Sequence, residues 1–204
     1  SRIGMLLDEG ADIIDIGACS TRPGSRPVGA DEEWRRLEPV LRKARKDFPD
    51  ARFSIDTCWS SVVRNAYGLI GDFIVNDISA GEDDPDMLSV VGDLGLQYVA
   101  MHKRGTPEIM QCLTDYHDVT QEVVSYFRDF AIRAEAAGVK DWILDPGFGF
   151  AKTVEQNWQL LRDLGEILRF DQNDNGSQNC RKRRCLVGVS RKSMIYKPLE
   201  FVGI

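Results

Sequence analysis

Short apolar runs alternate with longer amphipathic segments along the chain. Six runs end on a polar residue and are predicted to be strands, at residues 13–17, 52–56, 73–76, 96–101, 142–144 and 185–189. Between them the apolar spacing is that of helices, predicted at residues 2–10, 31–47, 60–70 and 119–137, before Gly95, and up to about residue 170. Strands that alternate with helices predict a parallel sheet with right-handed crossovers. The carboxyl ends of such strands share one edge, where α/β proteins place their active sites.

The strand count indicates which kind of sheet to expect. A closed (β/α)₈ barrel has eight strands in about 250 residues, whereas six are predicted here, with a helix ahead of the first. If the fold is a TIM (β/α)₈-type barrel, the first and eighth strands are lacking. These two are neighbours in a closed barrel, so the outer strands would expose unpaired edges. We expect a single domain over residues 1–204.

Residues 171–184 interrupt this pattern. They are polar, rich in Asn, Gln and Gly, and close with the basic run Arg181-Lys182-Arg183-Arg184. Such a composition predicts a disordered surface insertion. The basic run is also compatible with a nuclear localisation signal, but we favour a solvated loop.

Composition narrows the class of partner. The formal net charge is −6, which argues against nucleic acid, because phosphate binding requires clustered positive charge. No apolar run approaches the roughly 20 residues that cross a bilayer, and the first residues lack the pattern of a signal peptide; no membrane partner is expected. The five cysteines are scattered and odd in number, which indicates a reduced, intracellular chain.

Three polar residues at predicted strand ends could bind a flat nitrogen heterocycle. Asp56, Asn76 and Asp145 close three different strands and should therefore share one rim. A carboxylate accepts paired hydrogen bonds from an amino group and an adjacent ring N–H, as it does from a guanidinium. Each residue alone could instead cap the next helix, but the three together favour a binding site.

Two further segments carry cations and hydroxyls. Ser190-Arg191-Lys192-Ser193 lies at a strand end, and Thr21-Arg22-Pro23-Gly24 lies in a loop rich in Pro and Gly. Both suit an anionic or electron-rich ligand, although either could be a solvated turn. Met101 and Phe150 are candidate apolar walls for a flat ring, or simply core residues.

The histidines and cysteines argue against covalent hydrolysis. His102 and His117 are the only histidines, no Gly-x-Ser-x-Gly motif is present, and no cysteine has an evident histidine partner. We expect His102 to make a structural hydrogen bond.

Taken together, these segments resemble the dihydropteroate synthase family. The matching stretches follow the family's order along nearly the whole chain: Ile14-Asp15-Ile16-Gly17, Ser20-Thr21-Arg22-Pro23-Gly24, Ser54-Ile55-Asp56-Thr57, Asn76-Asp77-Ile78-Ser79, residues 101–107, residues 145–153 and residues 187–193. Cys19 and Ala151 are more similar to the synthase domain of the multifunctional fungal folic acid synthesis proteins. The resemblance implies a TIM barrel that joins p-aminobenzoate to 6-hydroxymethyl-7,8-dihydropterin pyrophosphate and releases pyrophosphate and dihydropteroate, in folate biosynthesis.

The resemblance also implies roles for individual residues. Those implied to hold the pterin are Asp56, Asn76, Asp145 and Lys192, with Met101 and Phe150 against its ring. Those implied for the aminobenzoate pocket are Thr21, Arg22 and Pro23, with Ser193 beside them and Arg191 near the same rim. The catalytic set that the resemblance implies is Asp56, Lys192 and Arg191. Mg²⁺ is implied as a cofactor, although the family's Asn ligand on the first strand and its Arg-x-His on the eighth have no counterpart here. The family is usually dimeric, and we expect a cytoplasmic location, or a mitochondrial one in a eukaryote.

The chemistry of the strand-end residues agrees with this resemblance. Loss of pyrophosphate leaves positive charge on the pterin methylene, and carboxylates such as Asp56 and Asp145 would stabilise it. Aminobenzoate is a neutral aniline that needs orientation more than activation. Two alternatives stay open: a pterin-binding methyltransferase domain of the kind used with corrinoid proteins, and an inactive pterin-binding remnant. The Thr-Arg-Pro and Ser-Arg-Lys-Ser segments favour the synthase over the methyltransferase.

Overall fold

Six strands form one parallel sheet, and their order in the sheet is their order in the chain. The structure, a computed structural model, describes residues 1–19, 28–105, 109–170, 183–190, 192 and 194–196. The strands are β1 (Ile13–Gly17), β2 (Arg52–Asp56), β3 (Ile74–Asp77), β4 (Gln97–Met101), β5 (Trp142–Asp145) and β6 (Arg184–Cys185).

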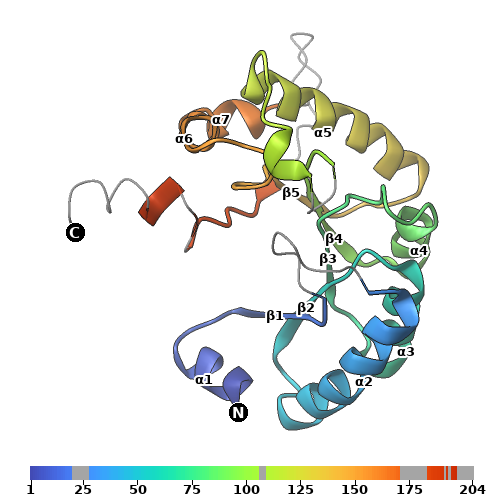
Figure 1. Ribbon diagram of the computed structural model, residues 1–204. Helices are drawn as coiled ribbons and strands as arrows, with labels where there is room; N and C mark the ends of the chain where they lie inside the picture. The colour runs from blue at the N-terminus through green and yellow to red at the C-terminus, as the bar shows by residue number, and fades with distance from the viewer. Residues whose placement is uncertain (20–27, 106–108, 171–182, 191, 193, 197–204) are drawn as a thin grey trace.

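Helices lie along one face and at the two ends of this sheet (Figure 1). They are α1 (Arg2–Asp8), α2 (Ala30–Asp47), α3 (Ser60–Ile70), α4 (Met87–Leu94), the 3₁₀ helix η1 (Met110–Cys112), α5 (Val119–Ala136), α6 (Val154–Arg162) and α7 (Leu164–Ile167). In Figure 1 the sheet curves, α2 to α5 lie along its convex side, and α1 and α6–α7 lie at its two ends. None of the described helices is long and apolar enough to cross a membrane.

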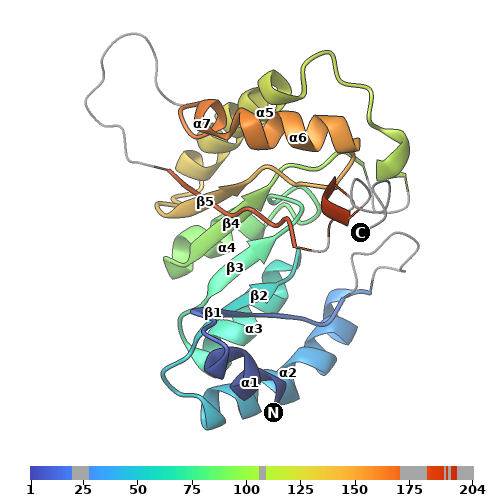
Figure 2. The same cartoon turned by 90° about the vertical axis from the view of Figure 1, so that its left-hand side faces the viewer.

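The described part of the sheet is an open arc. β1 and β6 lie at opposite edges, and Figure 2 looks into the side that lies between α1 and α6. Each pair of neighbouring strands is parallel, as right-handed β–α–β units require. An α/β barrel-type sheet of six strands is therefore confirmed, and it is not closed over the described residues.

Side chains alternate between the two faces of the sheet. In β1, Ile14 and Ile16 are buried against the helices, whereas Ile13 and Asp15 are exposed on the concave side. The strand register extends this alternation across the sheet, because residues paired between parallel strands point to the same face. We call the concave side the inner face; its members toward the carboxyl end are Asp15, Gly17, Ser54, Asp56, Asn76, Met101 and Asp145.

Two sequence predictions need correction at the carboxyl-terminal end. The strand predicted at 185–189 spans only Arg184–Cys185, because its partner β5 ends at Asp145 and the last hydrogen bond runs from Leu186 N to Leu144 O (2.9 Å). The helix predicted to continue to residue 170 is divided into α6 and α7 at Asp163, which ends one helix and begins the next.

The predicted insertion is also shorter than expected among the described residues. Arg184 opens β6 and pairs with Asp141 (2.5 Å), and the guanidinium of Arg183 lies 4.5 Å from the centre of the Trp142 ring. An ion pair and a cation–π contact therefore hold these two residues at the sheet edge. Residues 171–182 lie outside the described residues, so their predicted disorder stays a prediction.

Candidate active site on the inner face

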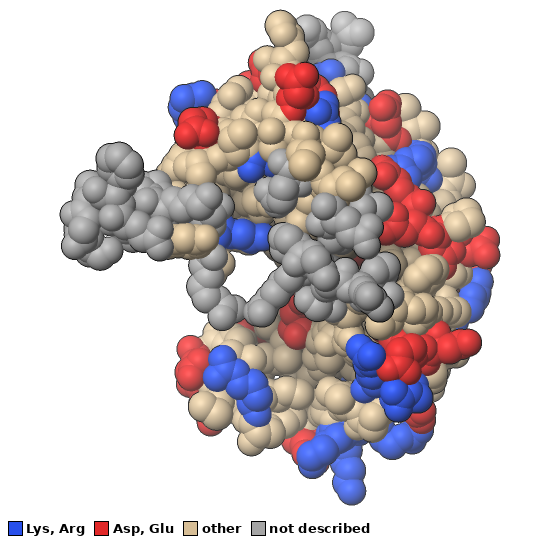
Figure 3. Space-filling view, in the orientation of Figure 1, with Lys and Arg blue, Asp and Glu red and all other residues tan. Residues whose placement is uncertain are grey.

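The strand register brings together the residues that the sequence singled out. Asp56 pairs with Asn76 between β2 and β3, and Met101 pairs with Asp145 between β4 and β5. All four therefore point to the inner face at the carboxyl end of the sheet. Figure 3 shows the molecule hollowed on this side.

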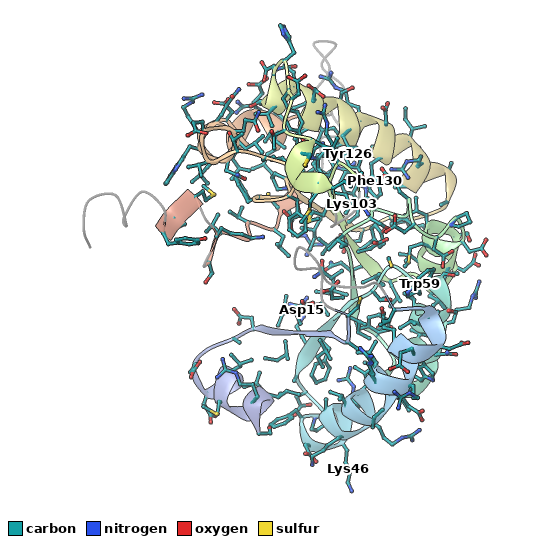
Figure 4. All side chains as sticks on the ribbon, viewed as in Figure 1. Asp15, Lys46, Trp59, Lys103, Tyr126 and Phe130 are labelled. Carbon is teal, nitrogen blue, oxygen red and sulfur yellow. The ribbon has the colours of Figure 1, made fainter. Side chains whose placement is uncertain are left out.

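Asp15 is a member of this site that the sequence reasoning did not select. Ser54 Oγ donates a short hydrogen bond to Asp15 Oδ1, and Asn76 Nδ2 lies 3.3 Å from Oδ1 and 3.4 Å from Oδ2 of the same carboxylate. Figure 4 shows Asp15 on the inner side of the sheet. Strand alternation was the available signal, because Asp15 lies two residues before the end of β1 and so shares the face of Gly17.

Asp56 lies among carboxylates. A Cβ atom at Gly17 would come within 3.1 Å of the Asp56 Cβ, so the glycine makes room for this side chain. Burial, together with the negative charges of Asp15, Glu33 and Asp77, raises the pKa of Asp56 to about 7. Near neutral pH Asp56 is thus present both as an acid and as a carboxylate, and it can donate or accept a hydrogen bond.

The two acids behind Asp56 differ in their surroundings. Asp77 is fully buried and accepts hydrogen bonds from Ser79 N (2.7 Å), Gly81 N (2.9 Å) and Tyr98 Oη (2.5 Å), so it organises the turn after β3. Glu33 of α2 is only 1 % exposed, and its Oε1 has no hydrogen-bond partner among the described residues. Burial raises the pKa of Glu33.

The segment after β5 holds Asp145 in place. Gly147 N donates to Asp145 Oδ1 (2.8 Å). The backbone turns through the left-handed region at Gly147 (φ +69°), Gly149 (φ +80°) and Ala151 (φ +52°), which glycine adopts without steric cost. A Cβ atom at Gly147 would lie 2.0 Å from His102 O, so this position also requires close backbone approach. The predicted structural hydrogen bond of His102 is confirmed, because its Nδ1 lies 2.9 Å from Lys152 Nζ.

Cations surround Asp145, unlike Asp56. Burial raises the pKa of Asp145 to about 6, although the Gly147 N–H, Lys192 and Lys152 favour the ionised carboxylate. The Nζ atom of Lys192 lies 4.5 Å from the centre of the Phe150 ring, a cation–π distance. Burial lowers the pKa of Lys192, and Asp145 opposes this. Asp145, Phe150 and Lys192 thus form one cluster beside Met101, which is 3 % exposed.

The remaining predicted site residues are not described. Thr21, Arg22, Pro23, Arg191 and Ser193 lie outside the described residues, so their place in an aminobenzoate pocket stays a prediction.

The described residues do not provide a site for the implied Mg²⁺. No group of three or more His, Cys, Asp or Glu side chains in the described part of the chain has an arrangement that could hold a metal ion. Asp15 is hydrogen-bonded to Ser54 and Asn76. We therefore derive no chemical step through a metal, and Mg²⁺ stays a prediction from the resemblance.

The cavity at the opposite end of the sheet is distinct from this site. It has a volume of about 660 Å³, and its lining includes Arg45, Arg52, Asp72 and Gln97. Arg45 is already bound to backbone carbonyls, among them Ile70 O (3.1 Å) and Ala51 O (3.2 Å). This cavity lies at the amino ends of the strands, whereas α/β proteins bind ligands at the carboxyl ends.

Sequence comparison relates the whole chain to one family. The family described as "Pterin binding enzyme" matches residues 1–203. The chain is 41% identical over 197 residues to the dihydropteroate synthase of the cyanobacterium Synechocystis, an alignment that covers 96% of this chain and 64% of that protein. The chain thus spans less than two thirds of the length of this relative.

Solved structures give the same relation. The dihydropteroate synthase of Yersinia pestis, in complex with a sulfonamide drug, superposes with a TM-score of 0.86 at 34% identity, over 98% of this chain and 68% of that one. The enzyme of Thermus thermophilus, in complex with 4-aminobenzoate, gives a TM-score of 0.80 at 38% identity, over 100% of this chain and 71% of that one. Both likenesses extend over essentially all of the chain and confirm the predicted fold class.

Proposed function

Because the chain belongs to the dihydropteroate synthase family of pterin-binding enzymes, we propose that it serves the condensation of 6-hydroxymethyl-7,8-dihydropterin pyrophosphate with p-aminobenzoate. The products are 7,8-dihydropteroate and pyrophosphate. One observation carries the proposal: Asp56, Asn76 and Asp145, far apart in the sequence, share the inner face at the carboxyl end of the sheet.

The site has the groups that a pterin ring requires. A pterin presents an amino group and an adjacent ring N–H, and a carboxylate accepts from both. Asp145 suits this role because its pKa of about 6 leaves it ionised at neutral pH. Asn76 can donate and accept at the ring edge, and Phe150 and Met101 can contact the ring faces.

The carboxylates of the inner face suit a reaction in which pyrophosphate leaves the pterin methylene and the aniline nitrogen replaces it. The bond between the pterin methylene and the pyrophosphate oxygen breaks, and the electron pair leaves with pyrophosphate. The aniline nitrogen then forms a bond to the methylene and loses a proton. Positive charge develops on the pterin as the first bond breaks, and the carboxylates of Asp15, Asp56 and Asp145 lie where they would stabilise it.

The solved relatives support the choice of the second substrate. The Thermus enzyme was crystallised with 4-aminobenzoate and the Yersinia enzyme with a sulfonamide. In this chain, Thr21, Arg22 and Pro23, with Ser193 and Arg191, are proposed to form the corresponding pocket. We further propose the homodimer, the cytoplasmic or mitochondrial location and the fungal multifunctional context on the resemblance alone. Sedimentation would test the dimer.

Pterin binding to matched variants tests the proposal. We expect calorimetry with the pterin pyrophosphate to show binding that Asp145→Ala abolishes, with an unchanged far-UV circular dichroism spectrum. Asp72→Ala, an exposed acid at the opposite end of the sheet, should bind normally. Wild-type affinity in Asp145→Ala would exclude the proposed pterin site.

Turnover separates the proposal from its alternatives. We expect p-aminobenzoate to bind only when pyrophosphate or the pterin substrate is present, and dihydropteroate to form. Pterin binding without dihydropteroate would indicate the inactive remnant. Pterin binding with no response to p-aminobenzoate under any condition would favour a methyltransferase-type domain.

A further inference from the structure

Lys152 is a buried lysine whose ammonium has three acceptors. Only 4 % of the residue is exposed, although lysine is almost never fully buried unless it is paired. Its Nζ lies 2.9 Å from His102 Nδ1, 3.0 Å from Phe150 O and 3.1 Å from Gly147 O. An ammonium has three hydrogens, and each has one acceptor here.

The three acceptors come from two different strand ends. His102 follows β4, whereas Gly147 and Phe150 lie in the segment after β5. The same two strand ends are joined by a backbone hydrogen bond from His102 N to Asp145 O (2.9 Å). Lys152 therefore fixes the segment after β5 against the end of β4.

This segment determines where two proposed pterin contacts lie. Gly147 N donates to Asp145 Oδ1, and the Phe150 ring lies against Lys192. The backbone between them passes through the left-handed region at Gly147, Gly149 and Ala151. A non-glycine residue such as Ala151 adopts this region only when its surroundings impose it. Lys152 holds the carbonyls of Gly147 and Phe150, which lie within this run on either side of Gly149.

We infer that Lys152 is a positioning residue for the pterin, which acts through Asp145 and Phe150 and makes no contact with the ligand itself. This inference rests on the proposed pterin site at Asp145. It assigns to Lys152 two effects that can be measured separately, one on the geometry of the segment and one on the charge of the Asp145 carboxylate.

Two opposing effects act on the charge of Lys152. The three acceptors and the Asp145 carboxylate favour the ammonium, whereas burial favours the neutral amine. Burial lowers the pKa of Lys152 to about 7, and Asp145 acts in the opposite direction. Burial and Lys152 hold the pKa of His102 well below its usual range, so the imidazole is neutral and Nδ1 can accept. The titratable and charged groups around this lysine are His102, Asp145, Arg104 and Lys192. Two tyrosines contact the His102 ring, Tyr126 of α5 edge-on and Tyr116 tilted.

Two substitutions separate the geometric effect from the charge effect. Lys152→Met removes all three hydrogen bonds and the charge, and we expect pterin affinity to fall at least about tenfold. Lys152→Gln keeps an amide that can donate to both carbonyls, so we expect it to recover part of that loss. Both variants lack the charge, so in both the acidic limb of the binding–pH profile should move to higher pH as Asp145 becomes harder to ionise.

The controls distinguish this inference from failure of the proposed function. Lys46→Met alters an exposed lysine of α2 (Figure 4) and should change neither affinity nor pH profile. If wild-type protein binds no pterin, the proposed function fails. If wild-type protein binds and Asp145→Ala does not, but folded Lys152→Met keeps wild-type affinity and pH profile, then the positioning role is wrong.

A measurement on the wild-type protein decides the matter if the variants do not fold. The side-chain ¹⁵N resonance of Lys152 should shift when the pterin saturates the site, because the ligand changes the charge environment of Asp145. An unchanged resonance at saturation would overturn the inference.

Discussion

The two halves of the inner face hold the same residue type in opposite electrostatic surroundings. On the β1–β3 half, Asp56 lies among Asp15, Glu33 and Asp77, and no described lysine or arginine forms an ion pair with Asp15 or Asp56. Lys103, just after β4, is paired with Asp83 instead (3.0 Å). On the β4–β5 half, Asp145 has Lys152 and Lys192 near it and a backbone N–H on its carboxylate.

The difference suggests a separate role for each half. We call the β4–β5 half the anchoring half, because it would hold the ligand, whereas the β1–β3 half would stabilise positive charge. The β4–β5 half is fixed by hydrogen bonds before any ligand arrives, so it suits the recognition of a neutral ring edge. The β1–β3 half accumulates carboxylates at a cost in stability, a pattern that functional sites show when they must meet a developing positive charge. The predictions below test this division, from the largest expected effect to the smallest.

Gly147→Ala should break the anchoring half. The new Cβ would meet His102 O at 2.0 Å, on a backbone with φ +69°. We expect the free energy of unfolding to fall by about 3 kcal/mol or more, and pterin binding to be lost. Gly95→Ala is the matched control, because Gly95 lies in the left-handed region (φ +66°, ψ +24°) and nothing lies within 4 Å of the added atom; it should cost only about 1 kcal/mol. Equal unfolding midpoints in urea for the two variants would contradict the close contact at His102.

Asp56→Asn should alter the pH dependence of stability. The pKa of Asp56 is raised to about 7 in the folded protein, against about 3.9 in an unfolded chain. The native state therefore keeps a proton that the unfolded state loses, and stability falls as pH rises from about 4 to 7. Asn lacks this titration, so wild type should lose about 4 kcal/mol more than the variant across that range.

Urea unfolding at several pH values measures this difference. Asp145 titrates in the same direction between about 4 and 6, but it is present in both proteins and cancels in their difference. Parallel stability curves for wild type and Asp56→Asn would show that Asp56 is ionised throughout.

Lys192→Met should weaken the anchoring half without unfolding it. The methionine retains an apolar stem against Phe150 but loses the cation–π contact and the charge near Asp145. We expect pterin affinity to fall about five- to tenfold in calorimetry. Lys140→Met, at an exposed lysine before β5, is the control. An unchanged affinity in Lys192→Met would remove this residue from the site.

Asp15→Asn should produce the smallest effect. The amide removes one negative charge near Asp56 and can still accept from Ser54 and Asn76. We expect the pKa of Asp56 to fall by less than about one unit, as followed by ¹³C NMR of its carboxyl carbon. An unchanged pKa would mean that Asp15 does not contribute, and that burial with Glu33 and Asp77 sets the pKa of Asp56.

The central fold was predictable because each strand–helix unit has its own apolar run followed by an amphipathic segment. β1 and β2 have the predicted bounds, and β3 and β4 begin one residue later than expected. Errors concentrate at the last strand, where Arg183 and Arg184 look like part of a polar insertion until Trp142 and Asp141 provide partners. Such partners lie about forty residues away, so local composition could not reveal them.

The candidate site was predictable to the extent that it depends on strand ends. Asp56, Asn76 and Asp145 could be selected because each closes an apolar run. Asp15 was missed because it lies inside a strand, where only alternation places it on the inner face. Lys152 was missed because its role depends on a chain reversal that returns Nζ to His102, and sequence pattern does not specify that geometry.

The sequential order of the strands also has a consequence for biosynthesis. Since each strand pairs with the one made just before it, a nascent chain that leaves the ribosome can add every new unit to an edge that already exists, and no earlier pairing must be undone. The proposed pterin contacts follow the same order, with Asp15 on β1 and Asp145 on β5. Both sides of the proposed pterin site are therefore in place only after β5 has joined the growing sheet.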